Sequence, residues 1–201
     1  MADPDDLWPD DPDDPEDLGP PPERPPSMVR AAVGFYAGMT ALAFVWAGIA
    51  GRLPLWVGEP PSADSVGRWA LVGVLFGLAM VIVSRLLSAI PALDEMSDIF
   101  RQILGPLTWP QAFLLAVLSG IAEELLFRGA IQPTLGLGPT CVLFAIVHWP
   151  MTPKLIPWTI SAGLLGLAFG YGFELSGHVT GPVLAHFTVN FLNLKALGDD
   201  D

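Results

Sequence analysis

Three charged side chains lie close together inside an apolar stretch near the middle of the chain: Glu123, Glu124 and Arg128. Ionised groups are costly to place in hydrocarbon, so within membrane segments they usually face a protein interior or a water-filled cavity and mark function. On a helix, Glu124 and Arg128 are four residues apart and share a face, which allows them to pair. Glu123 points in another direction and is left as a carboxylate without a local partner.

Two further apolar segments carry polar residues that can take part in the same chemistry. His148 ends one of them, and His186 and Asn190 lie four residues apart on one face of another. Glutamate with histidine is the minimal set for activating water, because a carboxylate can accept a proton that an imidazole shares or relays. A second histidine with an asparagine can donate hydrogen bonds to a developing oxyanion. Together these groups predict acyl hydrolysis by an activated water, although each histidine taken alone is also compatible with packing.

The sequence lacks the catalytic motifs of the other classes of intramembrane protease. The two Ser-Gly pairs, at Ser119 and Ser176, are preceded by Val117 and Glu174 where a Gly-x-Ser-Gly motif requires glycine. The chain has no His-Glu-x-x-His motif for a zinc helix. No aspartate lies in a predicted span, which argues against an aspartyl dyad. The third histidine, His178, follows a Ser-Gly pair and is expected in a loop.

The composition is that of a membrane protein. Of the 201 residues, 52% are hydrophobic and only 15% are charged, whereas soluble domains carry about a quarter charged residues. The net charge of −12 is concentrated in residues 1–27, which hold ten acidic residues and one arginine. This acidic, proline-rich tail is expected to be disordered, because it cannot bury enough apolar surface to fold. No basic stripe is present, so nucleic acid is not expected as a partner.

We therefore predict an all-α fold, a polytopic transmembrane helix bundle over residues 28–198 that follows the disordered tail. A membrane-spanning helix needs about 20 largely apolar residues. Six spans are predicted, at residues 29–50, 69–87, 109–127, 135–149, 155–173 and 179–197. Apolar positions within residues 88–107 recur at intervals of three and four, which predicts an amphipathic connector on the membrane surface. Control of substrate entry is the alternative role for this connector.

Pairs of glycines at four-residue spacing are typical of helices that approach closely in lipid. The pairs are Gly34/Gly38, Gly73/Gly77 and Gly166/Gly170. We interpret them as helix-packing positions of the bundle and not as a site.

The three polar motifs, taken in order, resemble those of a known family. Glu-Glu-x-x-x-Arg at 123–128, Phe-x-x-x-His at 144–148 and His-x-x-x-Asn at 186–190 are similar to the motifs of the CAAX protease and bacteriocin-processing family (CPBP), the type II CAAX prenyl proteases. Each motif lies on a predicted span, and the resemblance covers roughly residues 104–194. The resemblance implies a multi-pass membrane protein. Bacterial members of the family are often short, as this chain is, so a bacterial plasma membrane is the expected location.

The resemblance also implies a role for each residue of the site. Glu123 and His148 would activate the water, and His186 with Asn190 would form the oxyanion site. The supporting residues would be Glu124, Arg128 and Phe144. No cofactor is expected. A zinc ion held by Glu123, His148 and His186 is the alternative, since two histidines and a carboxylate are a common zinc ligand set.

The predicted function is an intramembrane endopeptidase that is similar to CAAX proteases. Its expected partners are the lipid bilayer and a peptide or membrane-protein substrate, with or without an attached lipid. The alternative is a non-catalytic membrane scaffold, or a bacteriocin self-immunity protein, that uses the same pocket for binding. A transporter is a third hypothesis, because intramembrane Glu, His and Arg also serve proton relays.

Overall fold

The structure is a computed structural model that describes residues 27–53, 59–150 and 152–197. Its regular elements are the helices α1 (Ser27–Ile49), α2 (Ala63–Leu87), α3 (Pro91–Leu104), α4 (Trp109–Glu124), α5 (Gln132–Leu135), α6 (Leu137–Val147), α7 (Ile156–Ser176) and α8 (Thr180–Ala196), with a π-helical segment η3 (Leu125–Ile131) between α4 and α5 and a 3-10 turn η4 (Pro153–Leu155) before α7. No strand occurs in these ranges, and the predicted all-α fold is confirmed. The predicted acidic tail lies outside the described residues, apart from its last residue.

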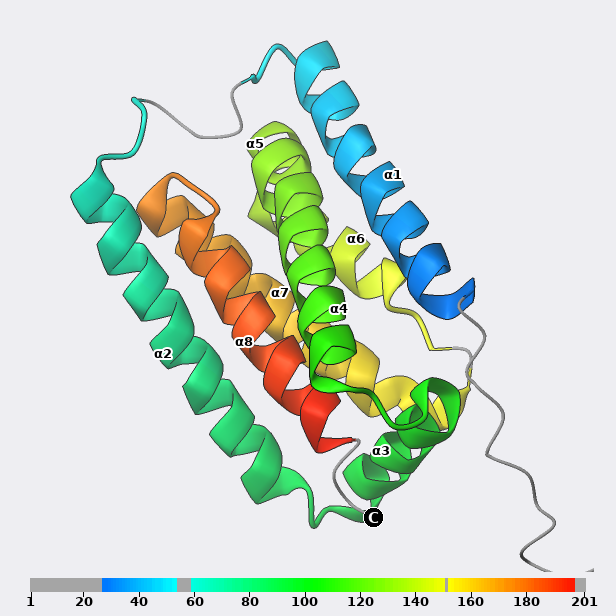
Figure 1. Cartoon of the computed structure of the whole chain (residues 1–201). Coiled ribbons are helices and arrows are strands. Elements are labelled where there is room, and N and C mark those ends of the chain that lie inside the picture. Colours follow the sequence, from blue (N-terminus) through cyan, green and yellow to red (C-terminus); the bar gives the residue numbers. More distant parts are fainter. Residues whose placement is uncertain (1–26, 54–58, 151, 198–201) are drawn as a thin grey trace, which may run out of the picture.

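Helix α4 is the central helix of the bundle (Figure 1). It packs against α1 on one side and α8 on the other, and α2 covers the far side of α8. Helices α6 and α7 pack against each other behind α4, and α7 also contacts α8. The three helices that carry the polar motifs, α4, α6 and α8, thus meet in the interior of the bundle.

Among the described residues, three helical segments are long and apolar enough to cross a membrane: Val29–Ile49, Ala63–Leu87 and Pro153–Ser176. They coincide with the first, second and fifth predicted spans. The second begins six residues earlier than predicted, because Ser62 caps α2 by accepting a hydrogen bond from the backbone of Ser65. The helices at the other three predicted spans are shorter, with 16 residues in α4, 11 in α6 and 17 in α8. The count of six spans stays a prediction.

The predicted amphipathic connector forms helix α3, which lies across one end of the bundle (Figure 1). None of the residues of α3 is fully buried. Glu95 of α3 pairs with Lys154 of η4 at 2.6 Å, and the rings of Phe100 of α3 and Trp158 of α7 make an edge-to-face contact. Its position on a membrane surface stays a prediction.

Two of the three glycine pairs are packing positions, as predicted. A methyl group on Gly73 of α2 would collide with the carbonyl oxygen of Gly181, and one on Gly77 would lie 2.7 Å from Thr188 of α8. Similarly, Gly166 of α7 leaves room for Phe144. The prediction is wrong for Gly34 and Gly38, because a Cβ atom added to either glycine would meet no atom of the described residues within 4 Å.

Local sequence explains how α4 begins and continues. Thr108 and Gln111 form a capping box, in which each side chain accepts a hydrogen bond from the backbone of the other. Directly after Glu124 the helix widens into the π-helical segment η3, whose residues from Leu126 onward are buried. π-Helical turns inside α-helices occur frequently at functional sites. This segment is not predicted by the sequence, because a change from four- to five-residue hydrogen bonding leaves no pattern in the hydropathy.

Candidate active site

Glu123 and Glu124 are the last two residues of α4, and both side chains are enclosed by the bundle. Glu123 is 8% exposed and Glu124 is fully buried. A buried carboxylate is stable only if it is paired or hydrogen-bonded, because removal from water is costly. The neighbours of the two carboxylates therefore decide what each can do.

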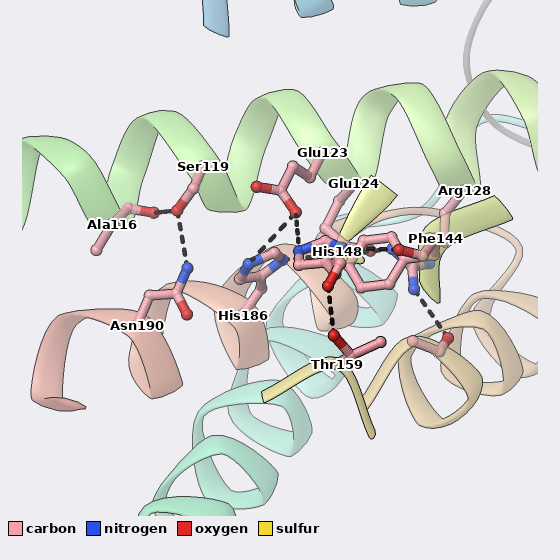
Figure 2. A network of polar contacts seen from close by, with 11 residues as sticks. Ala116, Ser119, Glu123, Glu124, Arg128, Phe144, His148, Thr159, His186 and Asn190 are labelled. Carbon is pink, nitrogen blue, oxygen red and sulfur yellow. Dashed lines mark hydrogen bonds and ion pairs between the residues drawn. The ribbon is translucent and has the colours of Figure 1, made fainter. Parts of the chain in front are cut away.

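The carboxylate of Glu123 faces two histidines (Figure 2). Its Oε2 atom lies 3.7 Å from Nε2 of His148 and 3.9 Å from Nε2 of His186. These separations are too long for direct hydrogen bonds. Oε2 is buried and has no hydrogen-bond partner among the described residues. The sequence prediction that Glu123 lacks a local partner is confirmed, and the bundle brings both predicted histidines to it.

Glu124 binds two partners through a single oxygen atom. Its Oε1 accepts hydrogen bonds from Nη1 of Arg128 at 3.0 Å and from Nδ1 of His186 at 2.8 Å. The first contact is the pair expected from four-residue spacing. The second joins residues 62 positions apart, and no feature of the sequence indicates it, since it depends on the register between α4 and α8. By holding Nδ1, Glu124 turns Nε2 of His186 toward Glu123.

Arg128 is 1% exposed and links three helical elements. Besides Glu124, it donates a hydrogen bond from Nη2 to the carbonyl oxygen of Gly166 in α7 at 2.8 Å. Its guanidinium group lies over the ring of Phe144, 4.5 Å from the ring centroid, a cation–π contact. Phe144, predicted as a supporting residue, thus packs directly on the buried ion pair.

His148 caps the end of α6, and its ring is fixed on several sides. Nδ1 lies 2.7 Å from the carbonyl oxygen of Phe144, so Nδ1 carries a proton and Nε2 faces Glu123. The ring packs on Phe144 and on Trp158, and the backbone carbonyl accepts a hydrogen bond from Thr159. Trp158 and Thr159 were not predicted from the sequence, because they lie in α7, a helix that carries none of the three polar motifs.

His186 and Asn190 occupy successive turns of α8 opposite successive turns of α4 (Figure 2). His186 faces Glu123, and its ring stacks on Phe169. Asn190 donates a hydrogen bond from Nδ2 to Oγ of Ser119 at 2.9 Å. The two helices run antiparallel. One turn along α4, from Ser119 to Glu123, therefore corresponds to one turn back along α8, from Asn190 to His186. Ser119 was missed as a site residue; its place one turn before Glu123 is the signal that indicates it.

Comparison with known proteins identifies the segment that holds these residues. Residues 105–192 match the family described as type II CAAX prenyl endopeptidase Rce1-like. This segment is therefore similar to the CPBP family of type II CAAX prenyl proteases. The matched segment contains all seven predicted site residues, from Glu123 to Asn190.

Two curated relatives resemble parts of this chain. An uncharacterized protein of Bacillus subtilis (strain 168), YpbD, is 30% identical over 100 residues, which are 49% of this chain and 51% of that protein. CAAX prenyl protease 2 of Rattus norvegicus is 28% identical over 117 residues, which are 51% of this chain and 36% of the rat protein. The chain thus spans about half of the first relative and about a third of the second. No solved structure matches.

Whether the site could hold a zinc ion depends on how its possible ligands are arranged. Within the part of the chain that the structure describes, no group of three or more His, Cys, Asp or Glu side chains is arranged to hold a metal ion. Glu123, His148 and His186 do converge, with Nε2 of His148 3.7 Å and Nε2 of His186 3.9 Å from the carboxylate. Independence of metal stays a prediction, to be tested by chelation.

Proposed function

We propose that this chain is an intramembrane endopeptidase that hydrolyses a peptide bond with a water activated by Glu123 and His148. The observation that carries the proposal is the position of Glu123 Oε2, buried and unpartnered among the described residues, between Nε2 of His148 and Nε2 of His186. A carboxylate in this position is not needed for an ion pair, since Glu124 already neutralises Arg128.

The base consists of Glu123 with His148. At 3.7 Å, Glu123 Oε2 and His148 Nε2 are too far apart to bond directly but near enough to bind the same water molecule. As that water attacks the carbonyl carbon, its proton passes to this pair and then to the amine that leaves. His148 is held for this task by Phe144 and Trp158, so little reorganisation is required.

The oxyanion that forms in the attack requires hydrogen-bond donors. His186 Nδ1 donates to Glu124, and a proton on Nε2 gives an imidazolium that the carboxylate of Glu124 stabilises. That Nε2–H and the amide of Asn190 are the donors for the oxyanion. Removal of one such donor typically costs about 10² to 10³ in kcat.

The substrate class follows from the surroundings of the site. We infer a peptide or a membrane-protein segment, with or without an attached lipid, because the site lies between apolar helices. A multi-pass location in a bacterial plasma membrane fits the three long apolar helices and the resemblance to a Bacillus subtilis protein.

The proposal is tested by comparing the termini of membrane peptides in cells that express the wild type, Glu123→Ala or His148→Ala. Both variants should accumulate in the membrane and lose the same set of cleavages. The matched control is Glu174→Ala, because Glu174 is an exposed glutamate of α7 outside the site. Cleavage that persists in Glu123→Ala would refute the proposed mechanism.

Two further arms separate the alternatives. A metal chelator should leave cleavage by the purified protein unchanged, whereas loss of cleavage that zinc restores would support the Glu123, His148 and His186 zinc site. A phenotype that survives Glu123→Gln without any cleavage would favour a binding or immunity protein instead of an enzyme.

A further inference from the structure

Ser119 of α4 lies inside the bundle, one turn before Glu123, and contacts a residue of the candidate site. It is 4% exposed, and its Oγ atom accepts a hydrogen bond from Nδ2 of Asn190 in α8 at 2.9 Å. Asn190 is one of the two proposed donors to the oxyanion. An asparagine amide has a donor NH₂ group at one end and an acceptor oxygen at the other. The residue that holds Asn190 therefore decides which of the two ends serves the reaction.

The single proton of the Ser119 hydroxyl determines the orientation of this amide. Ser119 donates that proton to the carbonyl oxygen of Ala116, three residues earlier in α4, at 3.3 Å. With its proton in use, the Oγ atom can meet Asn190 only as an acceptor. The reversed amide would place Oδ1 against the lone pairs of Oγ, and two acceptors repel each other. Figure 2 shows the nitrogen of Asn190 turned toward Ser119 and the oxygen turned away.

Small residues of α4 allow a side chain as short as serine to reach α8. Ala116 is fully buried, and Gly120 lies so close to α8 that an added Cβ atom would be 3.2 Å from the backbone nitrogen of Phe187. Ser119 shares this face of α4, since it lies three residues after Ala116 and next to Gly120. At this close approach the Oγ atom, one bond beyond Cβ, reaches the amide of Asn190. The contact is therefore part of the packing between the two helices that carry the site.

We propose that Ser119 is a positioning residue of the active site, which holds the amide of Asn190 so that its NH₂ group, and not its oxygen, serves the oxyanion. This inference rests on the proposed function. One N–H of Nδ2 is bound to Ser119, and the other remains for the oxyanion. Without Oγ the amide is free to turn over, and its oxygen then repels the developing negative charge. The loss falls on the transition state and not on substrate binding, because the carbonyl of the bound substrate carries little charge.

The test uses the purified full-length protein in proteoliposomes. The probe is a quenched-fluorescence peptide copied from a cleavage site that the wild type produces and Glu123→Ala does not. Ser119→Ala should lower kcat about tenfold with KM unchanged, because the donor stays in the site but is no longer held. Its matched control is Ser88→Ala, since the hydroxyl of Ser88 also donates to a carbonyl oxygen three residues earlier, that of Arg85, at the exposed end of α2. The control should change neither constant.

A double variant separates positioning from a structural role. Asn190→Ala should lower kcat about 10²-fold, and Ser119→Ala should add less than about a twofold effect in that protein, since the amide on which it acts is gone. A serine needed only for the packing of α4 would keep its full effect there, and that result would overturn the inference. A kcat of Ser119→Ala within about twofold of the wild type, or a rise in KM alone, would overturn it as well while leaving the proposed function intact. Failure of the proposed function itself would appear separately, as cleavage that does not depend on Glu123.

Discussion

Glu124 Oε1 accepts a hydrogen bond from Nδ1 of His186 at 2.8 Å, across the contact between α4 and α8. The same oxygen binds Arg128, so one buried carboxylate both neutralises a buried cation and orients an imidazole. The neighbouring Glu123 is left to face Nε2 of that imidazole. Two adjacent glutamates therefore differ in role because they point to different sides of one helix.

Arg128 is expected to be a strong determinant of stability. Arg128→Met should lower the free energy of unfolding by about 3–5 kcal/mol, because the change leaves the fully buried Glu124 without its cation. The control is Arg68→Met, which breaks a pair of the same four-residue spacing with Asp64, where both side chains are more than two-thirds exposed. That pair should contribute no more than about 1 kcal/mol. Thermal unfolding in detergent micelles measures both, and equal losses would contradict this account.

Trp158 is expected to influence catalysis through His148. Its ring packs against the imidazole, with centroids 5.1 Å apart, and also contacts Phe100 of α3. Trp158→Leu should lower kcat about tenfold, because a displaced base is a poorer one even when the fold is kept. Trp149→Leu serves as the control, since Trp149 is next to His148 in sequence but 74% exposed. A kcat for Trp158→Leu equal to that of the control would show that this contact does not position His148.

Alanine substitutions at two of the paired glycines are expected to change stability in opposite directions. Gly73→Ala should destabilise the protein by about 1–3 kcal/mol, because the added methyl group would collide with the backbone of Gly181. Gly34→Ala should stabilise it by up to about 1 kcal/mol, since alanine favours the helix and no described neighbour is near that position. Melting temperatures measured side by side test the pair. The same sign for both would mean that α2 and α8 do not pack as described.

His178 is expected to make stability depend on pH. It lies buried in the turn between α7 and α8, with Nε2 3.1 Å from the hydroxyl of Ser65, and burial lowers its pKa below the ordinary value of 6.5. Above pH 6.5 the imidazole is neutral in both the folded and the unfolded state. Below pH 6.5 the unfolded state takes up the proton first, so stability falls until the pH is below the lowered pKa of the folded state.

The measurement for His178 is the melting temperature in detergent between about pH 8 and about pH 5, for the wild type and His178→Gln. The contributions of His148 and His186 are common to both proteins and cancel in the difference. The wild type should lose more stability than the variant as the pH falls through the region of 6.5. Parallel curves would show that His178 is as easily protonated in the fold as in the unfolded chain.

The class of the fold and the members of the candidate site could be predicted from the amino-acid sequence. Long apolar runs predict membrane helices whatever their neighbours are, since the cost of an unpaired backbone in lipid leaves few other structures. Ionisable side chains within such runs indicate a site, because each is costly to place in hydrocarbon. Here they are Glu123, Glu124 and Arg128 in one run, and His148 and His186 in two others. The Glu124–Arg128 pair was predictable, because its partners lie one turn apart on the same helix.

Which of these groups meet depends on the packing of separate helices. The bond from His186 to Glu124 and the bond from Asn190 to Ser119 each require a particular register and rotation of two helices. Packing of small residues sets that register, as Gly120 does by allowing α4 to approach the backbone of Phe187. Such contacts leave no periodic pattern, because they join positions whose separation in sequence is arbitrary. The sequence pattern therefore indicated the chemistry, and the packing of α4, α6, α7 and α8 gave each residue its partner.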